Sequence, residues 1–207
     1  NDFRSETPLP KPDPGVQVVA RVAFINHLID TDMLSDVDPS LADLSAEQKQ
    51  QFVTRMKPER RAAPIGPALI RSAHGTAVEF TLYPLCMDSL TMTDTIASGD
   101  LEPIRREISE RIREARADGC RVAGLGMYTS IVTHNAQALE IPDVALTSGN
   151  ALTIGMGLEA IRQGAASQGL DLAEQTAAII GAAGNIASTY ASLLSENVDR
   201  LLLVGSG

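Results

Sequence analysis

The sequence predicts an α/β protein in two parts, an N-terminal α/β domain that is joined by a helix to the beginning of a second α/β domain. Two observations lead to this expectation. Runs rich in β-branched residues alternate with amphipathic helical segments early in the chain. The last part of the chain predicts a strand, a glycine turn, a helix and a second strand. Because 207 residues can form one large domain or two small ones, the late position of that second pattern favours two domains.

The first elements are a strand and a helix. Residues 17–25, QVVARVAFI, are rich in β-branched side chains and predict a strand, which an acidic loop follows. Residues 45–57, SAEQKQQFVTRMK, predict a helix in which Ser45 is the N-cap and Gln48 completes a capping box. The apolar stripe of this helix is expected to be Phe52, Val53 and Met56.

A β-hairpin is expected next. The segments 68–73 and 76–83 flank the turn residues His74 and Gly75. The second segment alternates apolar with more polar residues, so one face of this strand is expected to be buried. The predicted buried face consists of Val78, Phe80 and Leu82.

A long helix is predicted over residues 100–117. Asp100 is placed to cap it, Pro103 lies in its first turn, and Gly119 ends it. Its apolar residues repeat every fourth position, which predicts one buried stripe. The stripe consists of Ile104, Ile108 and Ile112.

The middle of the chain predicts a short strand and a connecting helix. Residues 122–132, VAGLGMYTSIV, are expected to form a buried strand that breaks at Gly124 and Gly126. Residues 151–167 are rich in small side chains and predict a helix that ends near Gly169. We therefore expect a tail or linker at 1–15, a substrate domain at 16–150, a linking helix at 151–170 and a nucleotide-binding segment at 171–207.

Composition excludes some classes of function. The chain has 26 acidic and 17 basic residues, and its net charge of −9 disfavours binding to nucleic acid. Cys86 and Cys120 are too few for a disulfide framework, which favours a reducing cytosol. No apolar run has the length of a signal peptide or membrane span.

The segment 176–204 carries the clearest functional pattern. Its strand, glycine turn, helix and second strand form one complete βαβ unit, typical of the start of a Rossmann domain. Gly181 permits the tight turn, Gly184 lets a pyrophosphate approach the backbone, and Ala187 lets the helix pack on its strand. The predicted cofactor-binding residues are Gly181, Ala182, Ala183, Gly184, Asn185, Ile186 and Ser206.

The predicted cofactor is NADPH. The end of the second strand is followed by Gly205, Ser206 and Gly207, so the acidic residue that would bind a ribose 2′-hydroxyl is missing. Ser206 is placed to donate to a 2′-phosphate. The alternative is a strand-to-helix turn that binds nothing, with Ser206 an ordinary loop residue.

Five segments together resemble a known family. In order and spacing they are similar to the cyanobacterial long-chain acyl carrier protein reductases, over the chain from about Val19 to its end. The segments are AFINHLI (23–29), IRSAHGTAVEFTLYPLCM (70–87), GLGMYTSIV (124–132), LTSGNALT (146–153) and IIGAAGNIAS (179–188). The resemblance implies a substrate domain, a linking helix and a Rossmann domain that uses NADPH to reduce a fatty acyl thioester to an aldehyde.

The resemblance also bears on the catalytic residues, which remain unknown in this sequence. In the family a cysteine in the later part of the Rossmann domain takes up the acyl group, so we expect the nucleophile beyond Gly207 and the chain to be part of a longer polypeptide. Cys86 matches a cysteine of the family outside that position and is expected in the substrate cleft. The alternative is a buried thiol that behaves as a small apolar residue.

Hydroxyl and amide side chains are candidates for the rest of the substrate cleft: Thr129, Ser130, Thr147, Ser148, Asn150 and Thr153. The alternatives are that Thr129 and Ser130 merely end a strand, and that Ser148 or Asn150 caps the following helix. His27, His74 and His134 lack metal-ligand spacing, so no metal is expected. His27 and His134 are expected to follow strands, and neither is assigned as a catalytic base.

The expected partners are an acyl thioester on acyl carrier protein or coenzyme A, fused or partner synthase domains, and a second copy of the chain. The basic segment 55–61 is either a solvated helix end or a surface that attracts an acidic carrier protein. One alternative function is a shikimate-dehydrogenase-like oxidoreductase. It needs a cleft lysine, and Lys49 and Lys57 do not follow a buried strand. Another is a noncatalytic docking or nucleotide-sensing module.

Overall fold

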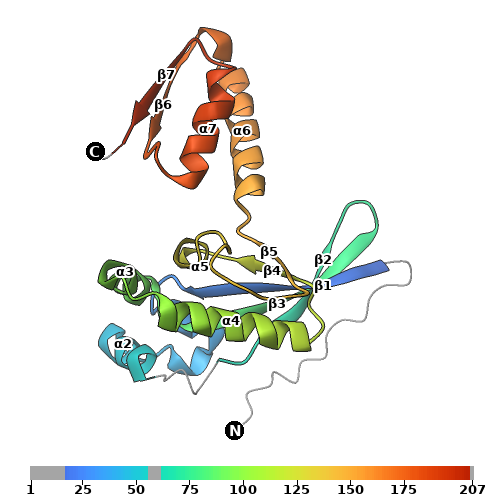
Figure 1. Cartoon of the computed structure of the whole chain (residues 1–207), viewed down its shortest axis with the longest axis vertical. Helices are drawn as coiled ribbons and strands as arrows, with labels where there is room; N and C mark the ends of the chain where they lie inside the picture. The colour runs from blue at the N-terminus through green and yellow to red at the C-terminus, as the bar shows by residue number, and fades with distance from the viewer. Residues whose placement is uncertain (1–16, 56–61, 206–207) are drawn as a thin grey trace. The chain divides into compact units, whose positions relative to one another are not determined.

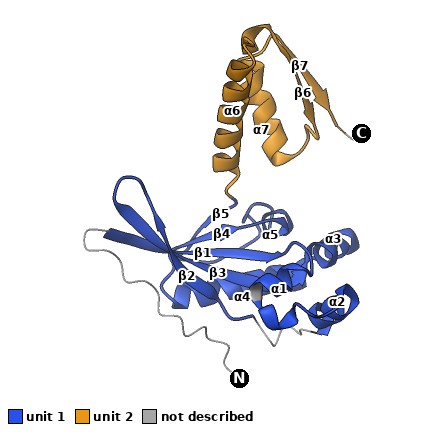
Figure 2. Ribbon diagram, turned by 180° about the vertical axis from the view of Figure 1, so that it is seen from behind, with its two compact units in different colours: residues 1–148 blue, residues 149–207 orange. Residues whose placement is uncertain are grey.

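The computed structural model describes residues 17–55 and 62–205, which form two compact units with their boundary in the chain between Ser148 and Gly149 (Figures 1 and 2). Each unit is an α/β structure, so the predicted fold class is confirmed. The assignment of substrate binding to the first unit and of nucleotide binding to the second stays a prediction. The tail at residues 1–15 lies outside the described residues.

The first unit is built on a mostly parallel sheet. Within the described residues its strand order is β2-β3-β1-β4-β5, and only β2 runs antiparallel to its neighbour. The strands are β1 (Gln17–Leu28), β2 (Ile65–Arg71), β3 (Thr76–Asp88), β4 (Val122–Leu125) and β5 (Ala145–Thr147). The helical segments are α1 (Met33–Val37), η1 (Pro39–Leu41), α2 (Ala46–Arg55), α3 (Ser89–Ser98), α4 (Glu102–Ala117) and α5 (Tyr128–Val132).

The hairpin prediction is confirmed, but the predicted buried face of β3 is wrong. Tyr83 and Leu85 are 1% exposed and belong to the main core, whereas Val78, Phe80 and Leu82 are half-buried. The phenolic hydroxyl of Tyr83 donates to Asp118 Oδ2 at 2.8 Å, which satisfies its polar end while the ring packs in the core. Alternation alone did not predict this, because β3 lies between two strands and both of its faces are partly covered.

The helix α2 begins as predicted. Ser45 and Gln48 form the reciprocal capping box: the Ser45 amide donates to Gln48 Oε1 at 2.8 Å, and the Gln48 amide donates to Ser45 Oγ at 3.2 Å. Val53 is buried and packs with Leu28 and Leu34 in a small second core. Phe52 lies at the edge of this stripe, 36% exposed, and Met56 lies outside the described residues.

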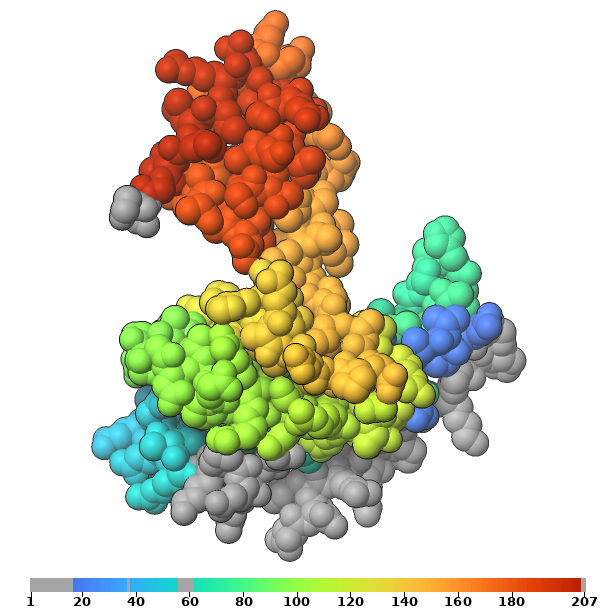
Figure 3. Space-filling model, viewed as in Figure 1, coloured from blue at the N-terminus to red at the C-terminus, as the bar shows by residue number. Residues whose placement is uncertain are grey.

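The helix α4 covers one face of the sheet with the predicted stripe. Ile104, Ile108 and Ile112 are 3%, 0% and 0% exposed. In the space-filling view the residues of α3 and α4 cover this face, and little of β1 is visible beyond its first residues (Figure 3). The predicted cap is wrong: Leu101 occupies the N-cap position without a side-chain hydrogen bond, so Asp100 lies one residue too early.

Two elements of the first unit differ from expectation. Helix α3 was not predicted; Asp88 caps it and Gly99, at φ 77°, ends it. The strand expected over 122–132 ends at Leu125, and its second half forms α5. The chain turns at Gly126 and Met127, where a positive φ of 54° at Met127 stops the extended backbone. His134 therefore follows a helix and not a strand.

The second unit contains the predicted βαβ order. It comprises α6 (Asn150–Ser167), η2 (Leu172–Glu174), β6 (Thr176–Ile180), α7 (Asn185–Ser195) and β7 (Arg200–Val204), with β6 parallel to β7. Parallel strands are usually buried on both faces. In this chain Ile179 is 8% exposed, but Ile180 is 84% exposed, because α7 covers only part of a two-stranded sheet.

Among the described residues, no helix is both long and apolar enough to cross a membrane.

Candidate functional site

The turn between β6 and α7 has the geometry expected of a strand-to-helix glycine turn. Gly181 adopts φ 76°, a conformation that favours glycine. The amides of Gly181 and Ala182 both donate to the Val204 carbonyl, at 2.7 and 3.1 Å, and the Gly184 amide donates to the Gly181 carbonyl at 2.9 Å. The turn is therefore held by its own backbone and by β7.

The N-terminus of α7 is the candidate anion site of this turn. Gly184 is its N-cap and no side chain caps the helix. The Ser188 amide makes the first helical bond, to the Gly184 carbonyl at 2.8 Å, so the amides of Asn185 and Ile186 precede the regular hydrogen-bonding pattern. Amides at the start of a helix and the helix dipole both favour an anion such as a phosphate.

A side chain is restricted at Gly184 by space and at Gly181 by its positive φ. A Cβ at Gly184 would lie 3.3 Å from the Gly181 carbonyl oxygen. Of the predicted cofactor-binding set, Gly181, Ala182 and Gly184 use their amides within the fold, whereas Ala183, Asn185 and Ile186 lie at the start of α7. Ser206 lies outside the described residues. Nucleotide binding by these residues stays a prediction.

The first unit has a second candidate region at the carboxyl ends of its parallel strands. The chain leaves β1 for β3 on one side and later returns to β4 on the other, so the strand order reverses between β1 and β4. Open α/β sheets bind ligands at such switch points. The residues that meet there are His27 at the end of β1 and Met127 and Tyr128 after β4.

His27 is buried at this switch point and has two polar partners. Its ring is 1% exposed, Nδ1 lies 2.7 Å from the Leu28 carbonyl oxygen, and the Tyr128 amide donates to Nε2 at 3.2 Å. The ring also stacks on Tyr128, with centroids 5.6 Å apart. Burial lowers the pKa of His27, against the opposing effects of the Leu28 hydrogen bond and the negative charge of Asp88. A neutral structural histidine fits this position better than a catalytic base.

Asp88 ends β3 beside this region. It is 3% exposed and accepts hydrogen bonds from the Thr91 amide at 2.8 Å and the Thr91 hydroxyl at 2.6 Å. Burial by itself would raise the pKa of Asp88, but the hydrogen bonds from Thr91 and Gln50 hold it below the usual value. Asp88 is thus an ionised helix cap.

Met127 has a strained backbone at φ 54° and ψ −134°. Such a conformation costs a residue with a side chain about 1–3 kcal/mol, so the surrounding structure must hold it in place. The side chain is 40% exposed. The close approach of the turn to β1 is visible at Gly126, where a Cβ would lie 2.3 Å from the Phe24 ring.

The structure separates the predicted substrate-cleft residues. Thr129 is 0% exposed and its hydroxyl donates to the Gly126 carbonyl at 2.6 Å, so the prediction that it faces a cleft is wrong. Ser130 is half-buried and its hydroxyl donates to the Met127 carbonyl at 3.0 Å. Both hydroxyls stabilise the β4–α5 turn.

The other four candidates are divided between the units. Thr147 and Ser148 belong to the first unit, and Asn150 and Thr153 to the second. The alternative role as a helix cap is wrong for Ser148 and Asn150, because Gly149 occupies the N-cap position of α6 without a side-chain bond. The Thr153 hydroxyl donates to the Gly149 carbonyl at 3.3 Å. Substrate contact by these residues stays a prediction.

Neither cysteine has the environment of a nucleophile. Cys120 is buried and Cys86 is half-buried, and no disulfide joins them. Burial is the largest influence on both thiols and raises the pKa of each. For Cys86 this fits the alternative of a small apolar residue better than a reactive thiolate.

Other polar features also have structural explanations. Lys49 is buried and its Nζ lies 3.2 Å from Asp32 Oδ1, which joins α2 to the segment after β1.

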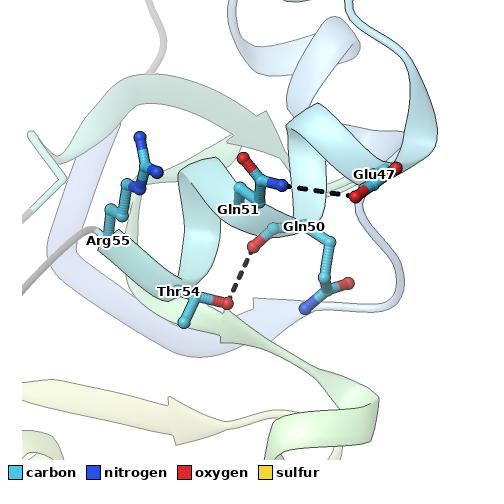
Figure 4. Close-up of a pocket in the computed structure, with 5 residues that line it drawn as sticks. All are labelled: Glu47, Gln50, Gln51, Thr54 and Arg55. Carbon is cyan, nitrogen blue, oxygen red and sulfur yellow. Dashed lines mark hydrogen bonds between the residues drawn. The ribbon is translucent and has the colours of Figure 1, made fainter.

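A surface pocket is lined only by exposed or half-buried residues of α2, among them Gln50 and Arg55 (Figure 4). The rest of the basic segment, residues 56–61, lies outside the described residues. No group of three or more His, Cys, Asp or Glu side chains gathers within 17–55 and 62–205.

Comparisons with known proteins show a distant relationship to a reductase. No protein-family model matches the chain. It is 24% identical over 174 residues to a long-chain acyl-[acyl-carrier-protein] reductase of Synechococcus elongatus, which covers 80% of this chain and 49% of that protein. It is 32% identical over 130 residues to the aminotransferase PigE of a Serratia species, over 61% of this chain and 14% of that protein. The chain thus spans about half the length of the acyl-[acyl-carrier-protein] reductase and a smaller part of the aminotransferase.

Sequence reasoning missed the joint role of His27 and Tyr128, and also Asp88 as a cap. The signal for Asp88 was present, since an aspartate precedes a threonine-rich segment after a strand. The pairing of His27 with Tyr128 had no local signal, because the two residues are 101 positions apart.

Proposed function

We propose that this chain is the substrate-domain and cofactor-turn part of an NADPH-dependent reductase that converts an acyl thioester to an aldehyde. The observation that carries the proposal is the β6–turn–α7–β7 unit, in which a glycine turn leads into a helix without a side-chain cap. The distant similarity to an acyl-[acyl-carrier-protein] reductase supports the reaction class.

In this proposal the turn binds the pyrophosphate of the cofactor. The amides of Asn185 and Ile186 and the dipole of α7 favour the negative charge, and Gly184 leaves room for the phosphate oxygens. NADPH is preferred over NADH because no acidic residue follows β7 at Gly205. A reduced nicotinamide held by this turn would supply the hydride that reduces the thioester carbonyl to the aldehyde, with the thiol as leaving group.

The acyl group is proposed to be carried by a cysteine that is neither Cys86 nor Cys120, because burial raises the pKa of both. The thioester substrate is proposed to arrive on an acidic acyl carrier protein or on coenzyme A. A reducing cytosol is the proposed compartment, as the two-cysteine composition predicts.

Cofactor binding is tested by titrating the isotope-labelled 207-residue chain with NADPH and NADH and following amide signals by NMR. NADPH is expected to shift the signals of Ala183, Asn185 and Ile186, with low affinity, since one βαβ unit provides only part of a dinucleotide site. Gly184→Val should remove these shifts, because its Cβ occupies the phosphate approach. Gly164→Val is the matched control, since no atom lies within 4 Å of the position of its Cβ. Equal shifts in both variants would contradict the proposed site.

The reaction is tested with acyl coenzyme A and acyl carrier protein substrates, by measuring NADPH-dependent aldehyde formation. We expect a longer polypeptide that contains this sequence to form aldehyde and the 207-residue chain to form none. Robust turnover by the 207-residue chain would refute the assignment of the nucleophile to another cysteine.

A further inference from the structure

The β4–α5 turn is held against β1 through the ring of His27. The Tyr128 amide donates to His27 Nε2 at 3.2 Å, and the same two residues stack with an interplanar angle of 21°. Met127, directly before Tyr128, is one of several non-glycine residues of this unit with positive φ, and its backbone lies at φ 54° and ψ −134°. The contact with His27 therefore fixes the residue that follows the strained peptide.

The partners of His27 determine which form of the ring is present. The Leu28 carbonyl oxygen can only accept, so Nδ1 must carry the hydrogen across the 2.7 Å contact. The Tyr128 amide can only donate, so Nε2 must be without a hydrogen. Both hydrogen bonds exist together only in the neutral ring with its hydrogen on Nδ1.

We propose that His27 is a pH-dependent latch, whose neutral ring holds the β4–α5 turn in its strained conformation and whose protonation releases it. A hydrogen added to Nε2 would point at the Tyr128 amide hydrogen, so an attractive contact becomes a repulsive one. Met127 is then free to leave the strained region of backbone conformation. This inference concerns the first unit only and holds whatever ligand the chain binds.

The release is confined to a short segment. The Gly126 amide donates to the Ile25 carbonyl at 2.9 Å, and this bond does not involve His27. At the other end of α5, Arg105 Nε of α4 donates to the Val132 carbonyl at 2.7 Å. Between these anchors Thr129 is buried, and its hydroxyl lies 2.6 Å from the Gly126 carbonyl oxygen and 3.3 Å from the Ile25 carbonyl oxygen. The released part is therefore the backbone at Met127 and Tyr128, where Met127 is 40% exposed at the switch point of the sheet. Opening the latch would therefore change the surface of this edge.

Charges around the ring set the direction of the pH response. Asp88, at the end of β3, favours the protonated ring, while burial of the ring opposes protonation more strongly and lowers its pKa from 6.5. Two further polar side chains belong to the elements around the ring: Arg105, whose Nε donates to the Val132 carbonyl, and Tyr128, whose aromatic ring stacks on His27. The latch is thus closed at neutral pH and opens on acidification below the ordinary histidine range.

The test is NMR of the full 207-residue chain over a pH series. Ring nitrogen shifts of His27 are expected to show a protonated Nδ1 and a bare Nε2 at neutral pH. As the pH falls, the ring should titrate below the ordinary histidine value, and the Tyr128 amide should shift and lose protection from hydrogen exchange in the same transition. A ring with its hydrogen on Nε2, or a Tyr128 amide that ignores the titration, would overturn the proposal.

Two variants separate a local latch from general acid unfolding. His27→Gln removes the titrating ring and should abolish the pH response of the Tyr128 amide. His74→Gln, in the exposed β2–β3 turn, removes a histidine elsewhere and should leave that response unchanged. Simultaneous loss of the signals of both units at the pH of the transition would overturn a local switch. If His27→Gln does not fold, the ring tautomer and the coupled titration of the native chain decide the question.

Discussion

The phenolic oxygen of Tyr190 on α7 lies where a side chain on Gly157 of α6 would begin. A Cβ at Gly157 would be 1.6 Å from that oxygen and 2.8 Å from Cζ. The same hydroxyl donates to the Thr153 carbonyl at 3.1 Å, one turn earlier on α6. The two helices of the second unit can approach this closely only because residue 157 lacks a side chain.

Gly157→Ala should therefore destabilise the second unit. Tyr190 must move and lose its bond to Thr153, and overpacking of this kind costs about 1–3 kcal/mol in the free energy of unfolding. The measurement is urea unfolding followed by circular dichroism. Gly155→Ala is the control: no atom lies within 4 Å of its Cβ, and it should be neutral or slightly stabilising. Equal effects of the two alanine substitutions on the free energy of unfolding would contradict the close contact. Adding Tyr190→Phe to Gly157→Ala should restore part of the lost stability, because it removes the hydroxyl that the new Cβ would meet.

Arg111 is expected to be essential to the first unit. It is 1% exposed, and its guanidinium donates to the Pro84 carbonyl at 2.8 Å and to Glu114 Oε2 at 2.6 Å. Arg111→Met leaves these acceptors with one donor fewer and should lower the free energy of unfolding by about 3 kcal/mol. The free energy of unfolding of Arg111→Lys, which retains the charge but not the planar guanidinium, should lie between the values of the native protein and Arg111→Met. Unchanged urea midpoints in Arg111→Met would show that the buried guanidinium contributes nothing.

The stability contribution of Asp88 should depend on pH. Its lowered pKa means that the native state favours the ionised carboxylate, so the contribution is complete above the ordinary value of 3.8 and is lost as the pH falls through the lowered native value. Asp88→Ala should cost about 1 kcal/mol at neutral pH through loss of the α3 cap. Asp88→Asn should cost less and lack the pH dependence. The measurement is unfolding of all three proteins at neutral and acidic pH, and a constant difference between native protein and Asp88→Ala at all pH values would contradict the prediction.

The uncovered face of the β6–β7 sheet should cause self-association. Pairing of Ile180 with Val204 and of Ala178 with Leu202 places Ile180, Leu202 and Val204 on one face, and these apolar residues are 84%, 43% and 49% exposed. We expect the mass measured by sedimentation to rise with concentration. Ile180→Lys should reduce this rise, whereas Leu90→Lys, which adds the same charge at a 62% exposed site on α3, should not. A 21.9 kDa monomer at every concentration would contradict the prediction.

The local elements of this chain could be predicted from its sequence. The capping box of Ser45 and Gln48, the isoleucine stripe of α4 and the whole β6–Gly181–α7–β7 order follow from residues within a few positions of one another. Side-chain capping, helical periodicity and the backbone freedom of glycine act over that range, so the pattern is complete in the sequence itself.

Contacts between distant segments were decided only by the tertiary structure. Residues 128–132 were expected to continue a strand, but they form α5 after a turn whose bonds reach the distant β1, among them the bond from the Tyr128 amide to His27, 101 positions earlier. The same holds for Tyr83, which is buried because Asp118 satisfies its hydroxyl, and for Thr129, whose hydroxyl is used by the Gly126 carbonyl. The sequence by itself determined the elements with a strong local pattern, such as α2, α4 and the β6–Gly181–α7–β7 unit, because those choices depend on neighbouring residues. Which polar side chains are buried and which remain at the sheet edge depended on partners that only folding brings within hydrogen-bonding distance.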